Sequence, residues 1–129
     1  MTNCMPEAQE LTTLVVENEA PILELLRRML TRNGVTDVDA VATTQEGLDL
    51  LRERDYGLVF TDLNQKPSGI EVYRAAIAKG SDAYIMSGYA PDILEAQVIA
   101  QDHFLQKPFD IMTIDEIIKE CIARKRDQS

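Results

Sequence analysis

Short apolar runs alternate with amphipathic stretches along nearly the whole 129-residue chain. This alternation predicts repeated strand–helix units, in which helical crossovers leave the strands parallel in one sheet. The runs are continuously apolar, which is typical of parallel strands buried on both faces. The expected strands cover residues 12–16, 38–41, 57–61, 83–86 and 103–106. The expected helices begin near residues 20, 43, 70, 91 and 111, so the chain predicts five βα units in one α/β domain.

Several helix ends are marked by single residues. Asn33 and Gly34 should end the first helix, because both tolerate the left-handed backbone. Thr43 or Thr44 can cap the second helix with its hydroxyl. The third helix should cover 70–79 and the last 111–126, where the basic residues 124–126 complement the helix dipole.

Composition excludes several classes of function. The net charge of −9 argues against direct binding to nucleic acid, which needs a basic surface. No apolar run approaches the roughly 18 residues of a membrane span, and residues 1–10 lack the features of a secretory signal. We therefore expect a cytoplasmic domain over residues 11–126, with tails at 1–10 and 127–129. Cys4 and Cys121 match no metal-binding spacing, and free thiols are the favoured interpretation over a disulfide.

Polar groups follow four of the predicted strands at the point where each strand ends. Asp62 ends one apolar run, Glu17 and Asn18 follow another, and Ser87 and Lys107 follow two more. Because ligands bind outside the carboxyl ends of the strands in open α/β sheets, these groups should meet at one edge. Each alone is explained as an ordinary turn or surface residue. Together they are the parts needed to phosphorylate a carboxylate with the help of a metal ion.

The segments that carry these groups resemble a response-regulator receiver domain. The matching segments read LVVENEAPIL, GLVFTDLN followed by KPSGIE, YIMSGYAP and FLQKPFD, and the resemblance extends from about Leu11 to Arg126. It implies a doubly wound, flavodoxin-like (βα)5 fold with a five-stranded parallel sheet in the order 2-1-3-4-5. It also implies a single-domain receiver, similar to chemotaxis regulators, that acts in two-component signalling or a phosphorelay.

The resemblance implies that Asp62 accepts a phosphoryl group from a phosphohistidine. Ser87 would hydrogen-bond the bound phosphoryl group and Lys107 would pair with it, and the Lys107–Pro108 peptide is generally cis in the family. A divalent cation, Mg²⁺ or Mn²⁺, would assist. The implied metal ligands are Glu17, Asn18, Asp62 and Asn64.

Other positions would control switching and lifetime. Ser87 and Phe104 match the residues that move together when the family is phosphorylated, although a plain core role for Phe104 is a serious competitor. Asn64 and Tyr89 match positions that tune how long the phosphoryl group survives, and Tyr89 would shield it from water. His103, the only histidine, is interpreted as a polar residue starting the fifth strand, since one histidine makes a poor metal site.

Two departures from the family pattern affect the site. Asn18 stands where an aspartate usually binds the metal; an amide oxygen brings no charge, so metal affinity should fall unless Glu19 compensates. The loop after Asp62 is also unusual, because Pro67 and Gly69 lie five and seven residues on instead of four and eight.

We therefore expect a phosphoacceptor that signals through a protein-binding surface and acts as an enzyme only in assisting its own phosphorylation and dephosphorylation. The phosphoryl donor would be a histidine kinase or phosphotransfer domain. A downstream protein would bind the face formed by the fourth helix, fifth strand and fifth helix. One alternative is a pseudo-receiver, a constitutive interaction module without efficient phosphorylation. A flavodoxin-like small-molecule binder is disfavoured, because the loop at residues 17–21 is acidic and contains no glycine to approach a phosphate.

Overall fold

Five parallel strands form one sheet in the order β2-β1-β3-β4-β5. The computed structural model describes residues 10–65, 68–88 and 103–128. The strands are β1 (Thr13–Val16), β2 (Val38–Val41), β3 (Leu58–Asp62), β4 (Asp82–Ser87) and β5 (Phe104–Gln106). The helices are α2 (Ala20–Arg32), α3 (Thr44–Glu53), α4 (Ile70–Ala78) and α5 (Ile111–Gln128). The predicted fold class and strand order are confirmed, while the helix expected from residue 91 lies outside the described residues.

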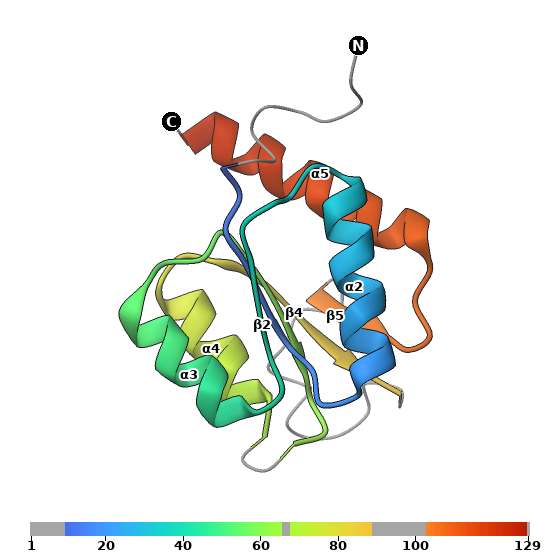
Figure 1. The fold of residues 1–129 in the computed structure, drawn as a ribbon. Helices are drawn as coiled ribbons and strands as arrows, with labels where there is room; N and C mark the ends of the chain where they lie inside the picture. Colours follow the sequence, from blue (N-terminus) through green and yellow to red (C-terminus); the bar gives the residue numbers. More distant parts are fainter. Residues whose placement is uncertain (1–9, 66–67, 89–102, 129) are drawn as a thin grey trace.

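The helices cover the sheet in two layers (Figure 1). On one face, the side chains of Val15 and Phe60 pack in a cluster with residues of α2 and α5. On the other face, Val16 and Val59 pack with residues of α3 and α4. Every residue of β1 and β3 is buried, which is why these strands read as continuous apolar runs. Burying a Leu, Ile, Val or Phe side chain contributes about 1.5–3 kcal/mol, so the two clusters hold both layers to the sheet.

The helix ends follow the residues that predicted them. The Thr43 hydroxyl accepts a hydrogen bond from the Glu46 backbone N–H at 3.1 Å and donates to the Glu46 carboxylate at 2.9 Å, which caps α3. After α2, Gly34 has a φ of 89°, a conformation that glycine adopts without steric cost. The last helix continues to Gln128, two residues beyond its predicted end.

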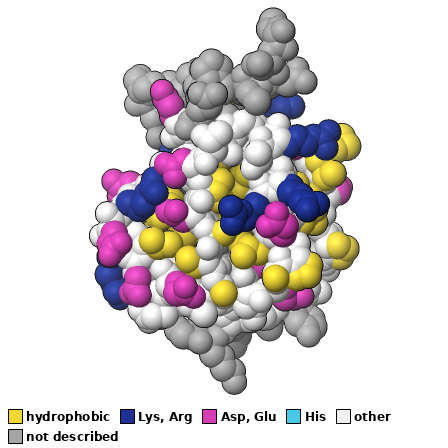
Figure 2. All heavy atoms as spheres, viewed as in Figure 1, with side chains coloured by type: hydrophobic (Ala, Val, Ile, Leu, Met, Phe, Trp, Pro, Cys, Tyr) yellow, Lys and Arg dark blue, Asp and Glu magenta, His cyan; other side chains and the backbone are white. Residues whose placement is uncertain are grey.

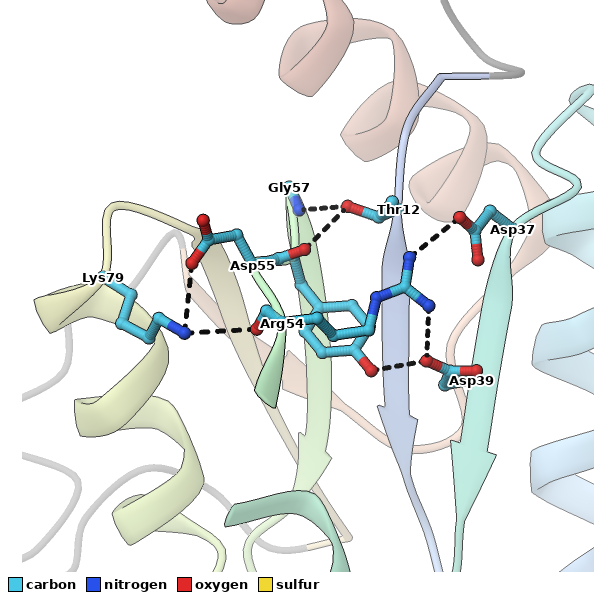
Figure 3. A network of polar contacts seen from close by, with 8 residues as sticks. Thr12, Asp37, Asp39, Arg54, Asp55, Gly57 and Lys79 are labelled. Atoms are coloured by element: carbon cyan, nitrogen blue, oxygen red, sulfur yellow. Dashed lines mark hydrogen bonds and ion pairs between the residues drawn. The ribbon is translucent and has the colours of Figure 1, made fainter. Parts of the chain in front are cut away.

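A polar network lies at the amino ends of the strands, before β2 and β3 (Figure 3). Arg54 pairs with Asp37 at 2.9 Å and with Asp39 at 3.0 Å, and its guanidinium group lies 5.0 Å from the centre of the Tyr56 ring. The Tyr56 hydroxyl donates to Asp39 at 2.5 Å; burial and this hydrogen bond raise the pKa of Tyr56 well above its usual value. Lys79 at the end of α4 donates to the Arg54 carbonyl at 3.2 Å. These contacts join α3, α4 and β2 at the edge of the sheet opposite to the strand-end residues described next.

The described cysteine belongs to the core. Cys121 is free and fully buried in the cluster beneath α5. Burial raises the pKa of its thiol to about 12, so it remains protonated and behaves as a small apolar residue. Cys4 lies outside the described residues.

Candidate functional site

Two buried carboxylates lie at the carboxyl ends of neighbouring strands. Glu17 follows β1 directly, and Asp62 is the last residue of β3. The register pairs Val16 of β1 with Thr61 of β3, so the residues that come next reach the same edge. Glu17 is 1% exposed and Asp62 is 2% exposed. Charged groups are almost never buried to this extent without a partner.

Lys107 supplies the partner for both carboxylates. Its ammonium nitrogen lies 2.7 Å from Glu17 Oε1 and 3.4 Å from Asp62 Oδ1. A third carboxylate, that of the exposed Glu19, reaches to within 3.6 Å of the same nitrogen. The lysine follows β5, where its backbone N–H donates to the Ser87 carbonyl at 2.7 Å, and the Lys107–Pro108 peptide bond is cis. The Lys107 ammonium group, on a side chain that is 12% exposed, thus faces three anions, two from the loop after β1 and one from the end of β3.

The electrostatics of Glu17 and Lys107 reflect this arrangement. Burial raises the pKa of Glu17, as does the charge of Asp62, while hydrogen bonds from Lys107 and from the Glu19 backbone N–H at 3.0 Å oppose the rise. Burial alone would lower the pKa of Lys107. Its hydrogen bond to Glu17 and the surrounding negative charges outweigh burial, and the pKa of Lys107 is raised. The lysine therefore stays protonated throughout the physiological range.

The remaining predicted residues lie at different depths around this centre. Ser87 ends β4 and is 1% exposed. Asn64 and Asn18 are both exposed, on the loops after β3 and β1. The Asn64 backbone N–H donates a hydrogen bond to Asp62 Oδ1 at 3.2 Å. Phe104 pairs with Ile85 and packs, half-buried, against the cluster beneath α3 and α4. Tyr89 lies outside the described residues.

Gly69 contacts the site from behind, and its role was not evident from the sequence. A Cβ atom at Gly69 would lie 1.8 Å from the Asp62 carbonyl oxygen. The Gly69 carbonyl accepts a hydrogen bond from the Thr61 hydroxyl at 3.4 Å. The shortened loop therefore folds back directly onto the backbone of Asp62, which only a residue without a side chain permits. The unusual position of this glycine was the available signal.

His103 and Gln65 anchor the segments next to the site. His103 directly precedes β5; its Nδ1 atom lies 2.8 Å from the Ala83 carbonyl oxygen, and its ring stacks on Tyr84 with the centres 5.0 Å apart. These contacts hold the start of β5 against β4.

Gln65, in the loop after Asp62, accepts a hydrogen bond from the Thr44 hydroxyl at 3.3 Å, which links that loop to the start of α3.

The side-chain oxygens at this site are suited to bind a hard cation. They carry less negative charge than a site with three carboxylates would. No group of three or more His, Cys, Asp or Glu side chains that could hold a metal ion occurs within the described ranges. Glu17 and Asp62 already direct oxygen atoms at one cationic group, Lys107. Mg²⁺ is commonly bound by one or two carboxylates while it keeps several waters. The residues present therefore fit Mg²⁺ or Mn²⁺, with Asn64 or Asn18 able to add an uncharged oxygen.

The profile of the response regulator receiver domain matches residues 13–119. The chain belongs to the response-regulator receiver family. This receiver is 30% identical over 118 residues to the response regulator MprA of Mycolicibacterium vanbaalenii. The aligned residues cover 88% of this chain and 48% of MprA. It is 25% identical to the response regulator Rre1 of Synechocystis over 95% of this chain and 56% of Rre1. The receiver thus spans about half the length of these curated relatives.

Solved structures agree with the fold. The response regulator TrrA of Thermotoga maritima, determined in complex with Mg²⁺ and BeF, is 28% identical; the comparison covers 86% of this chain and 98% of TrrA with a TM-score of 0.70. A CheY-like receiver from Methanospirillum hungatei, 24% identical, has a TM-score of 0.77 over 92% of this chain and 99% of that one. Within the part of the receiver that the structure describes, no helix is both long and apolar enough to cross a membrane.

Proposed function

We propose that this receiver accepts a phosphoryl group from a phosphohistidine onto Asp62 and signals by a change in its protein-binding surface. The observation that carries the proposal is the Lys107 ammonium group, which lies between the buried carboxylates of Glu17 and Asp62 at the ends of parallel strands. A buried carboxylate with a cation beside it can act as a nucleophile toward a phosphoryl group whose negative charge is partly neutralised.

The chemistry assigns a task to each residue. An Asp62 oxygen forms the new bond to phosphorus while the bond from phosphorus to the imidazole nitrogen breaks, and that nitrogen keeps the electron pair. The Asn64 backbone N–H and Lys107 both contact Asp62 Oδ1 and so orient the carboxylate. Ser87 and Lys107 stabilise charge on the transferred group. Glu17, Asp62 and an oxygen of Asn64 would hold Mg²⁺, which supplies further charge neutralisation.

Acetyl phosphate tests the acceptor directly. Incubation of the full chain with acetyl phosphate and Mg²⁺ should add one phosphoryl group, seen by intact mass, and the Asp62→Asn variant should gain none. Asp49→Asn is the matched control, because Asp49 is exposed on α3, and it should be labelled like the parent. Labelling that persists in Asp62→Asn, or that maps to another residue, would contradict the proposal.

A second candidate is the pseudo-receiver, a binding module that is not phosphorylated efficiently. It is favoured by Asn18, which leaves the site without the third carboxylate that a metal ion would use. The same experiment separates the two functions. A folded parent chain that gains no phosphoryl group at high acetyl phosphate and Mg²⁺ supports the second candidate.

We further propose that the phosphohistidine donor, a histidine kinase or phosphotransfer domain, docks over the amino end of α2. A groove of about 320 Å³ opens there beside Lys107. It is lined by Glu19, Ile22, Leu25, Lys107, Pro108 and Phe109. Leu25, on the wall of this groove, is 43% exposed. An apolar surface that continues into the reactive site is suited to a protein that must bring its histidine to Asp62.

Charge on the same helix indicates the character of the donor surface. Arg27, Arg28 and Arg32 are exposed on α2 in a chain whose net charge is −9. Figure 2 shows basic side chains beside hydrophobic and acidic ones on the side where Figure 1 draws α2, and Arg28 pairs with Glu24 at 3.7 Å. An apolar ridge flanked by acidic side chains would complement this surface. Output is proposed to use β5, α5 and the predicted preceding helix, which lies outside the described residues.

Two matched leucine and isoleucine positions test the donor surface. Leu25 on α2 and Ile77 on α4 are both 43% exposed, but only Leu25 lines the groove. With a purified histidine kinase that labels the parent chain, Leu25→Glu should slow transfer by about thirtyfold, which corresponds to the roughly 2 kcal/mol of an interface hot spot. Ile77→Glu should leave the transfer rate unchanged, and acetyl phosphate should label all three proteins equally. Equal slowing by both substitutions would contradict docking at α2.

A further inference from the structure

We propose that the Lys107 ammonium group is the resident cation of the acidic site, and that a divalent metal ion binds only when Lys107 leaves the Glu17–Asp62 bridge toward Glu19. The inference rests on the proposed function in one respect, that Glu17 and Asp62 are the metal-binding carboxylates. It adds that metal binding and the position of Lys107 are coupled.

One cation already contacts both carboxylates that are proposed to hold the metal ion. Lys107 Nζ is 2.7 Å from Glu17 Oε1 and 3.4 Å from Asp62 Oδ1, and these are the two buried carboxylates that would hold a metal ion. The side chains of Glu17 and Asp62 are 0% and 3% exposed, which leaves these oxygens little access to another partner. A divalent ion at the same oxygens would be a near neighbour of the ammonium group. Two cations in a poorly solvated site repel strongly, so one must move.

Glu19 provides the place to which Lys107 can move. Its carboxylate is 61% exposed and lies 3.6 Å from Lys107 Nζ, on the solvent side of the buried pair. Lys107 itself is only 12% exposed in its present position. Because a lysine side chain is long and flexible, a small rotation transfers its ammonium group from the inner pair to the outer carboxylate. Glu19 then keeps the lysine paired while the inner carboxylates accept the metal.

The number of charges at the site determines how strongly Lys107 competes with the metal ion for Glu17 and Asp62. A third carboxylate would strengthen metal binding enough to displace the lysine readily, but Asn18, on the exposed loop after β1, contributes no charge. The inner site therefore holds two carboxylates and one ammonium group. The free energy needed to move Lys107 is subtracted from the metal-binding free energy, so metal affinity is set partly by Glu19.

A double-mutant cycle on the full chain tests the coupling, with Mn²⁺ binding followed by electron paramagnetic resonance and Mg²⁺ binding by calorimetry. Lys107→Met should tighten Mn²⁺ binding by about tenfold or more. Glu19→Gln should weaken binding several-fold in the parent, because Lys107 loses its outer partner, and should have no effect in the Lys107→Met background. If Glu19 acted only through its charge on the metal, Glu19→Gln would weaken binding equally in both backgrounds. That result, or unchanged affinity in Lys107→Met, would overturn the proposal.

Lys107→Met leaves two buried carboxylates without a partner and can fail to fold. In that case a measurement on the parent chain tests whether Lys107 moves when the metal ion binds. The ¹⁵N resonance of the Lys107 ammonium group, assigned by its absence in Lys107→Arg, should be protected from exchange in the metal-free protein. Saturating Mg²⁺ should shift it and increase its exchange with water. A resonance that is unchanged at saturating Mg²⁺ would overturn the proposal. Both measurements follow metal binding alone, so their failure is distinct from a failure of Asp62 to be phosphorylated.

Discussion

Asp62 is positioned through its backbone as much as through its side chain. Lys107 and the Asn64 backbone N–H contact one carboxylate oxygen, while Gly69 packs on the backbone carbonyl from the other side. Gly69 has a φ of −61° and a ψ of −15°, values that any residue adopts. The requirement for glycine is therefore one of space and not of backbone conformation. A side chain at this position would push the loop away from Asp62.

Gly69→Ala should consequently lower both stability and reactivity. A methyl group at 1.8 Å from the Asp62 carbonyl oxygen forces backbone shifts, and overpacking of this kind costs about 1–3 kcal/mol. We expect a lower urea midpoint and slower labelling by acetyl phosphate. Gly88→Ala is the control for stability, because among the described residues no atom beyond its chain neighbours lies within 4 Å of the Cβ it would add. A Gly69→Ala protein as stable as Gly88→Ala would show that the loop relaxes freely and does not constrain Asp62.

At the scale of helices and strands, local signals predicted most of the fold. The Thr43 cap, the Asn33-Gly34 stop and the continuous apolar runs each depend on neighbouring residues, and the structure confirms them. Contacts between distant segments were not predictable in this way. The basic residues 124–126 were predicted only to complement the dipole of the last helix. In the structure Arg124 of α5 pairs with Asp82 of β4 at 3.0 Å. That pairing depends on how α5 crosses the sheet, which no local pattern encodes.

The same distinction applies to the site. A polar residue that follows a parallel strand must lie at the carboxyl edge, so the sequence was sufficient to bring Glu17, Asp62 and Lys107 to one place. The contact of Glu19 with Lys107 depends on the path of a loop and on a flexible side chain. The close approach of Gly69 likewise depends on how a shortened loop folds back.

At the scale of the whole molecule, the proposed metal binding would be linked to folding. A ligand that binds only the native state stabilises it, by about 2.7 kcal/mol when present at 100 times its dissociation constant. At the proposed metal site Asn18 would limit that effect, because it is uncharged where it follows Glu17 in the chain. An aspartate at the same position would add a metal ligand, but without metal it would increase repulsion in a chain that already has a net charge of −9.

Asn18→Asp should therefore change stability in opposite directions with and without Mg²⁺. Without metal, we expect a thermal midpoint a few degrees below that of the parent, because a further negative charge follows the buried carboxylate of Glu17 directly in the chain. With Mg²⁺ the midpoint of the variant should rise more than that of the parent, by about 3–5 °C for each additional kcal/mol of binding free energy in a domain of this size. Thermal unfolding followed by circular dichroism measures both.

Thr36→Asp provides the control for net charge, since Thr36 is exposed in the loop between α2 and β2, away from the strand ends that carry the site. It adds the same charge and should respond to Mg²⁺ as the parent does. An Asn18→Asp protein whose midpoint rises with Mg²⁺ no more than that of Thr36→Asp would place residue 18 outside the coordination of the metal. The ion would then be held by Glu17, Asp62 and the loop that Gly69 folds against Asp62, without a ligand from residue 18.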